Sequence, residues 1–392
     1  MMLANELEFR PQSHSAWWVQ VCLVAGALGL AGAVLVSPQR FWTNLLLASY
    51  LLLGLGLAGT FFVALQYMTG ASWGVAFRRV PEALSSALPV GAIGLLAIFF
   101  LHPSLYPWTH AGAAGGEALT GFKAAWLSLP FFWARSVFYL ALWFLLSRAI
   151  VRNSREQDRD PRPEYTRANI RYSAMYLLGF GLTFWLASMD WIMSLEPEWS
   201  TTMFGVYNFA GLFLGGLAAI TLLVIWLRKT TALGDFINEE HLHDLGKLLF
   251  AFSTFWMYIW FCQYMLIWYA NIPEETSYFI LRRHGFWEPI FLLNVFLNWI
   301  IPFVVLMPVS SKRNPSTLAK VAIIVLLGRW VDLYLMIFPP LTGQTPVFGF
   351  WEIGSIVGVF GLFLVIFQRA LGQATLVPLN DPRLEDSLHY HN

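Results

Sequence analysis

The chain has 392 residues, of which 57% are hydrophobic and 12% are charged. A soluble globular domain carries about 25% charged residues, so this composition excludes an ordinary soluble protein and favours membrane spans. The formal net charge is +1 and is spread over many loops, which argues against a nucleic-acid partner. The two cysteines, Cys22 and Cys262, fall in apolar stretches, so we expect packing residues rather than disulfide partners or iron–sulfur ligands.

Apolar stretches recur along the whole chain and predict one all-α, polytopic integral membrane domain (1–392) of ten transmembrane helices. Each span must be a helix, because backbone amides in lipid need partners within their own segment. Pro89 weakens the third span, and the second and seventh are long enough to tilt. The polar, acidic N-terminal segment is unlike a secretory signal, so we expect the first span to be retained. The expected spans are 17–36, 42–68, 83–101, 126–150, 170–192, 204–227, 247–271, 287–309, 317–338 and 350–371.

Basic residues set the expected orientation. In the loops and at the span ends, 18 Lys and Arg residues fall on one side and 4 on the other, while Arg135 and Arg329 lie well inside spans. This asymmetry predicts a multi-pass protein of the bacterial inner membrane with both termini in the cytoplasm. The polar segment 152–167, between the fourth and fifth spans, is the expected boundary between an early and a late half.

The histidines argue against a haem held by this chain. A membrane haem is usually held between histidines on facing helices, but no histidine is expected at mid-span, and His102 comes nearest, at the outer end of the third helix. No phosphate-binding loop or nucleotide fingerprint occurs. We therefore assign no catalytic residue and expect any electron chemistry to belong to partners. The eight histidines are His14, His102, His110, His241, His243, His284, His389 and His391.

Ionisable residues inside spans are costly, so each is a candidate for function. Arg135 is expected near the midplane of the fourth helix, where it needs a carboxylate, a carbonyl or a hydrated cavity; a structural ion pair is the competing interpretation. Asp190 ends the fifth helix close to the outer surface. It is a candidate for proton release together with Glu196 and Glu198, although exposed loop carboxylates usually have no special role.

Arg329 and Asp332 are three residues apart, so they share one face of the ninth helix. They either neutralise each other, or the carboxylate exchanges protons while the guanidinium keeps its pKa low. Asn294 and Asn298 form a polar stripe on the eighth helix. With Tyr264 in the seventh helix and Arg135, they are expected either to line a hydrated path or to hydrogen-bond neighbouring helices. Two further carboxylates, Glu288 and Glu352, are expected to cap helices.

A cluster of histidines and carboxylates, EEHLHDLGKLL, is expected to precede the seventh helix. Its spacing is not typical of a metal site, so helix capping or proton uptake through His243 is favoured over a metal, and no metal ligand is assigned.

Three strings resemble one protein family: WGVAFRRVPEALSSALP (73–89), DWIMSLEPEWSTTMFGVYNFAG (190–211) and HDLGKLLFAFSTFWMYIWFCQYMLIWYANIPEET (243–276). Over roughly residues 45–370, the chain resembles the ActF subunit of bacterial alternative complex III, within the polysulfide reductase/NrfD-like membrane subunits. The resemblance implies a four-helix bundle at 37–192, a second at 204–338, flanking helices at 17–36 and 350–371, and a cytoplasmic tail at 372–392.

The resemblance also implies partners and a role. The partners are a sister NrfD-like membrane subunit, a membrane-anchored multihaem cytochrome c, a periplasmic iron–sulfur protein, small membrane subunits and lipids. Haem c and iron–sulfur clusters would lie in those subunits, none in this chain, with menaquinone as a candidate ligand. The expected function is a non-haem scaffold and proton route coupled to menaquinol oxidation. The alternatives are a quinone-binding anchor of a molybdopterin oxidoreductase, and a secondary transporter.

Overall fold

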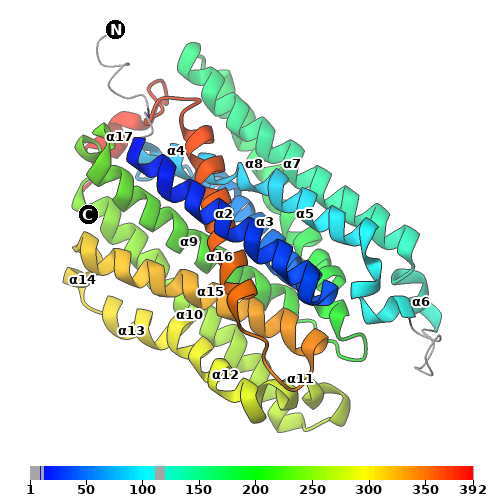
Figure 1. Cartoon of the computed structure of the whole chain (residues 1–392). Coiled ribbons are helices and arrows are strands. Elements are labelled where there is room, and N and C mark those ends of the chain that lie inside the picture. The colour runs from blue at the N-terminus through cyan, green and yellow to red at the C-terminus, as the bar shows by residue number, and fades with distance from the viewer. Residues whose placement is uncertain (1–8, 10–12, 111–119, 392) are drawn as a thin grey trace.

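The computed structural model describes residue 9, residues 13–110 and residues 120–391, with the backbone alone for residues 13–16. Within these residues, ten helical segments are long and apolar enough to cross a membrane, which confirms the expected polytopic all-α fold (Figure 1). The spans are α2 (Ser13–Val36), α3 (Pro38–Thr69), η1–α4–α5 (Val75–Leu101), α7 (Leu129–Arg159), α8 (Pro163–Trp191) with η4 to Leu195, α9 (Phe204–Thr230), α10 (Glu239–Ala270), η6–α12–η7–α13 (Gly285–Leu306), α15 (Pro315–Thr342) and α16 (Phe350–Leu371).

Several helices run beyond the expected spans at one end of the molecule. We call this the basic end; it is where α7 finishes, α8 and α10 begin, and most of the Lys and Arg residues gather. α10 has 32 residues and is about 48 Å long, against a hydrocarbon thickness of about 30 Å. α2 and α16 run antiparallel, so the start of α2 and the end of α16 lie at the same end of the molecule.

The expected boundary at 152–167 is wrong. α7 continues to Arg159, and α8 begins at Pro163, where proline suits the first helical turn. Only residues 160–162 connect them, and the two helices pack against each other. Hydropathy located the apolar part of each helix but not its polar continuation.

Two spans are irregular. The third consists of η1 (Val75–Phe77), α4 (Arg79–Leu84) and α5 (Ala87–Leu101), with Pro89 in the first turn of α5. In the eighth, a π-helical turn, η7 (Phe296–Ile300), separates α12 (Glu288–Val295) from α13 (Ile301–Leu306). Pro302 has no amide hydrogen, so the regular helical hydrogen bond from this residue is absent in any case. The π turn before Pro302 therefore costs little, because the bond that it would break does not exist.

Packing divides the eight central spans into two groups. The first bundle is α3, α5, α7 and α8; the second is α9, α10, α12–η7–α13 and α15. α3 contacts α9 and α15, and α8 contacts α9, so these helices join the bundles. In the apolar membrane-spanning stretch of each helix, 83% of the residues of α9 and 78% of those of α3 are buried inside the protein, whereas only 22% of those of α2 are. The molecular core therefore lies at the junction of the bundles.

The flanking helices α2 and α16 pack against each other across the outside of the bundles (Figure 1). Glycines line their contact: a Cβ on Gly26 would lie 2.3 Å from the Gly358 Cα, and one on Gly29 would lie 2.9 Å from the Gly354 Cα. Small residues let helix backbones approach closely in lipid, where dispersion contacts drive association.

The tail after α16 folds back over the basic end. Arg78 pairs with Asp381, and the Ser387 hydroxyl accepts a hydrogen bond from the Ala76 amide at 3.0 Å, beside α17 (Leu384–Leu388). Asn238 Nδ2 donates to the Tyr390 carbonyl at 2.8 Å. The tail thus ties the start of the third span to the start of α10.

Candidate functional site

Asp332 on α15 is the centre of a buried polar network in the second bundle. Its Oδ2 accepts a hydrogen bond from Arg329 Nη1 at 2.7 Å, one turn earlier on the same helix. Its Oδ1 accepts from the Tyr207 hydroxyl and, at 3.1 Å, from Asn294 Nδ2. Asp332 is 0% and Arg329 is 4% exposed. A buried ion pair is stable only where further hydrogen bonds satisfy both ions, and these donors do so for the carboxylate.

The network continues toward the basic end through the π turn. Asn298 Nδ2 donates to Asn294 Oδ1 at 2.7 Å and to the Asn294 carbonyl at 3.0 Å. The Asn298 carbonyl in turn accepts from the Ser253 hydroxyl on α10 at 2.6 Å. The two asparagines are four residues apart, as the sequence indicated, and the structure brings Asn294 to Asp332 and Asn298 to Asn294. π turns occur frequently at functional sites.

In the other direction the network reaches the first bundle. Arg329 Nη2 donates to Asn208 Oδ1 at 2.9 Å, and Asn208 Nδ2 donates to the Tyr50 hydroxyl on α3 at 2.7 Å. The Tyr50 ring contacts Trp191 edge-on, at 6.4 Å between centroids. Side chains from α3, α9, α12 and α15 thus form one connected polar unit.

Glycines provide the space that the ion pair occupies. A Cβ on Gly211 would lie 2.3 Å from Arg329 Nη1 and 2.9 Å from Asp332 Oδ2. On α15 itself, a Cβ on Gly328 would lie 2.8 Å from Asn298 Oδ1. A larger residue at either position would therefore force these side chains to shift from their present contacts.

A small cavity of about 10 Å³ adjoins the network on the side away from the basic end. A cavity of this volume is about large enough for one water molecule. Polar side chains converge on it from several helices, including the short α11 (Pro273–Arg283); they are Tyr207, Gln263, Tyr278, Arg282 and Asn294.

Arg282 lines this cavity and also pairs with Glu196, so it connects the two. Its Nη2 bonds Glu196 Oε1 at 2.5 Å, its Nε donates to the Leu335 carbonyl at 2.7 Å, and its guanidinium lies 3.4 Å from the centroid of the Tyr278 ring. Burial alone lowers the pKa of Arg282, but Glu196 and Tyr278 outweigh it and raise that pKa. Burial also raises the pKa of Tyr278. Arg282 therefore stays charged and Tyr278 stays neutral.

The first bundle holds a second buried ion pair, between Arg135 on α7 and Asp190 on α8. Arg135 donates from Nε to Asp190 Oδ2 at 3.0 Å and from Nη2 to Oδ1 at 2.8 Å. Trp126 Nε1 also donates to Oδ1, at 2.8 Å, and the Trp126 carbonyl accepts from Arg135 Nη1 at 2.9 Å. Arg135 lies in the second turn of α7, nearer the end opposite the basic end than the expected midplane.

The remaining candidate residues lie away from both pairs. Tyr264 accepts a hydrogen bond from Arg283 and stacks on Trp260. His243 lies at the basic end beside Glu240, at 3.6 Å, and Glu240 pairs with Arg313 at 2.7 Å. The segment EEHLHDLGKLL does not precede the helix but forms the first turns of α10, where Asn238 and His241 make a capping box.

Sequence reasoning missed several buried ion pairs. Glu352 does not act as a cap but accepts from Arg40 at 2.7 and 2.9 Å, which ties α16 to α3. Arg79 pairs with Glu82 at 2.5 Å and with Asp158. Arg79 and Glu82 are three residues apart on one helix, and this spacing could have predicted their ion pair. Arg40 and Glu352 lie 312 residues apart, so no local pattern could have predicted theirs.

Among the described residues, no group of three or more His, Cys, Asp and Glu side chains is placed to hold a metal ion. The side chain of His14 lies outside the described residues. Within the described part, His102 stacks on Trp42 at the end of α5, with 5.0 Å between ring centroids.

Comparison with known protein-family models and with curated protein sequences finds no match for this chain.

Proposed function

We propose that this integral membrane protein is the non-haem, ActF-like subunit of a quinol-oxidising complex of the alternative complex III type. In this role it supplies a scaffold and a proton route. The observation that carries the proposal is the network around Asp332, a buried carboxylate joined to hydroxyl and amide groups across four helices. Two of the strings that resemble the family contribute to it: 190–211 holds Tyr207 and Asn208, and 243–276 holds Ser253.

The proposed route crosses the second bundle. It starts at the basic end near His243, passes Ser253 and the asparagines of the π turn, and reaches Asp332 at the core. It continues through the Tyr207 hydroxyl and the adjoining cavity to the Arg282–Glu196 pair at the opposite end. A carboxylate that accepts from a rotatable hydroxyl group, as Asp332 does from Tyr207, can accept and return a proton.

Orientation and partners belong to the same proposal. The basic end faces the cytoplasm of a bacterial inner membrane, with both termini on that side. The partners are a sister NrfD-like subunit, a multihaem cytochrome c, a periplasmic iron–sulfur protein and small membrane subunits. Those partners carry the redox centres and oxidise menaquinol.

The test is the Asp332→Asn variant in the intact complex, reconstituted in vesicles. Asparagine keeps the size of the side chain but cannot hold a transferable proton. We expect the rate of proton release coupled to quinol oxidation to fall about tenfold or more, as a barrier increase of about 1.4 kcal/mol produces. The matched control is Glu274→Gln, which alters an exposed carboxylate of α11, outside the proposed route. Normal coupling in Asp332→Asn would remove this route from the mechanism.

Copurification tests the assignment to a complex. Haem c absorbance in the purified assembly supports the proposal, whereas molybdenum would favour the anchor of a molybdopterin oxidoreductase.

A secondary transporter is the second candidate, because η7 interrupts the eighth span beside buried Asn298 and Asp332. Purification as a stable monomer with substrate-dependent uptake would establish it and defeat the respiratory role.

A further inference from the structure

A large cavity opens at the basic end, between α7, α16 and the segment that joins α4 to α5. Its volume is about 1190 Å³, and it lies apart from both candidate ion pairs. Its lining combines apolar side chains, such as Phe144 and Ile366, with eight charged ones. Five are arginines and three are carboxylates: Arg148, Arg152, Arg155, Arg159, Arg369, Glu82, Glu156 and Asp158.

Four of these arginines form a stripe along α7. Arg148, Arg152, Arg155 and Arg159 are spaced by four, three and four residues, which places them on one face of the helix. The stripe starts where the apolar part of α7 ends. Below it, toward the membrane core, Phe138 and Leu145 are 58% and 61% exposed. α7 therefore presents an apolar surface followed directly by a cationic one.

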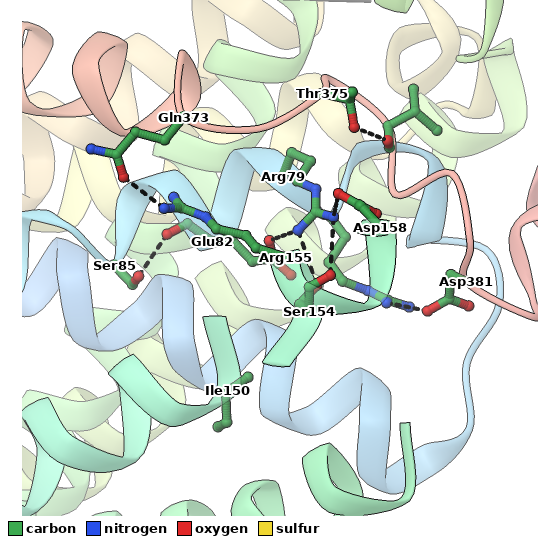
Figure 2. A network of polar contacts seen from close by, with 12 residues as sticks. Arg79, Glu82, Ser85, Ile150, Ser154, Arg155, Asp158, Gln373, Thr375 and Asp381 are labelled. Carbon is green, nitrogen blue, oxygen red and sulfur yellow. Dashed lines mark hydrogen bonds and ion pairs between the residues drawn. The ribbon is translucent and has the colours of Figure 1, made fainter. Parts of the chain in front are cut away.

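The carboxylates are already engaged by other arginines. Arg79, beneath the cavity, pairs with Glu82 at 2.5 Å and with Asp158, and it also bonds the Ser154 hydroxyl at 3.0 Å (Figure 2). Glu156 pairs with Arg159 at 3.3 Å.

Among the residues that the structure describes, the other arginines of the lining have no carboxylate partner. Arg155 donates to the Gln373 side chain at 2.7 Å (Figure 2). It also donates to the Ala370 carbonyl at 3.1 Å, and both acceptors are neutral. Within the described residues, no ion pair involves Arg148, Arg152 or Arg369. The five arginines of the described lining outnumber its three carboxylates, which leaves an excess of two positive charges beside the apolar lining residues.

We propose that this cavity binds the phosphate head group of an anionic phospholipid, whose acyl chains lie along the exposed face of α7. Guanidinium groups bind phosphate oxygens in bidentate geometry, and basic pockets between membrane helices hold acidic lipid head groups. A neutral quinone ring would leave the arginines without counter-charge. A free anion would use the arginines but not the apolar surface beside them.

The experiment uses the full chain in detergent and measures bound lipid by native mass spectrometry and thermal stability. The lipids are phosphatidylglycerol and phosphatidylcholine with identical acyl chains, and inorganic phosphate is a third ligand. We expect preferential binding of phosphatidylglycerol and a higher Tm with it. In Arg152→Gln/Arg369→Gln, binding of phosphatidylglycerol should weaken about 30-fold, because each basic residue near an anionic lipid contributes about fivefold.

The matched control is Arg167→Gln/Arg171→Gln, which removes two exposed arginines of α8 at the same end, outside the cavity. Its lipid binding should match the wild-type protein. Equal binding by the cavity variant and the control, or equal binding of both lipids, would overturn the proposal. A stabilisation by inorganic phosphate as large as that by phosphatidylglycerol would replace the lipid with a free anion. If the cavity receives an acidic segment of a partner instead, the wild-type chain would bind both lipids alike, which also overturns the proposal.

Discussion

The two buried arginine–aspartate pairs have the same charges but different neighbours. Asp190 in the first bundle is held by Nε and Nη2 on one edge of the Arg135 guanidinium, by an indole nitrogen and by a long bond of 3.4 Å from the Tyr139 hydroxyl. Asp332 in the second bundle receives one arginine nitrogen, a tyrosine hydroxyl and an amide, each of which leads to a further polar group or to the cavity. For the residues that the structure describes, the donors to Asp190 do not connect it to a longer chain of polar groups, whereas the donors to Asp332 connect it to several. Ion pairing alone therefore does not indicate a proton route; the connections beyond the pair do.

The largest expected effects come from removing single charges. Arg135→Met, Asp190→Leu, Arg329→Met and Asp332→Leu each leave a buried ion unpaired, so each should lose about 3–5 kcal/mol of stability. Each double variant, Arg135→Met/Asp190→Leu and Arg329→Met/Asp332→Leu, should recover most of this loss. Denaturant unfolding followed by tryptophan fluorescence measures it.

The same double variants separate structure from function. Proton release in the reconstituted complex should be retained with the apolar pair in the first bundle and lost with the apolar pair in the second. Normal proton release from Arg329→Met/Asp332→Leu would show that both pairs are only structural.

Removing one hydroxyl from each site should have a smaller effect. Tyr207→Phe deletes a donor to Asp332, and a hydrogen bond to a charged group contributes about 1.5–3 kcal/mol. Tyr139→Phe deletes a bond of 3.4 Å to Asp190, which is long, so we expect a loss below about 1 kcal/mol. Only Tyr207→Phe should slow proton release. A similar slowing in Tyr139→Phe would contradict the distinction between the two sites.

Glycine substitution tests the space around the second pair. Gly211→Ala places a methyl group against Arg329 and should cost about 1–3 kcal/mol, as overpacking of a core does. Gly181→Ala, on α8 of the first bundle, meets no atom within 4 Å and should be neutral or gain up to about 1 kcal/mol from helix propensity. Thermal unfolding of both variants decides this, and an equal loss in both would mean that Gly211 has no special role.

Sequence alone predicted the ten spans because hydropathy reflects the transfer of each residue into lipid, a property of the residue itself. It placed several helix ends wrongly, since α7 and α10 continue into water, where caps such as Asn238 decide the boundary. The contact of Arg329 with Asp332 follows from helical spacing. The contact of Arg135 with Asp190 spans 55 residues and depends on how α7 and α8 pack, which no local pattern encodes.

The glycine contact between α2 and α16 has a consequence for biosynthesis. Because the chain emerges from the ribosome in order, α2 enters the membrane while its partner is still unmade, and eight other spans are inserted before α16 arrives. Until then, the glycine face of α2 is in contact with lipid or with a chaperone. Closure of the α2–α16 pair is therefore a late step of assembly, and a chain that stalls before residue 350 would leave α2 without its closest neighbour.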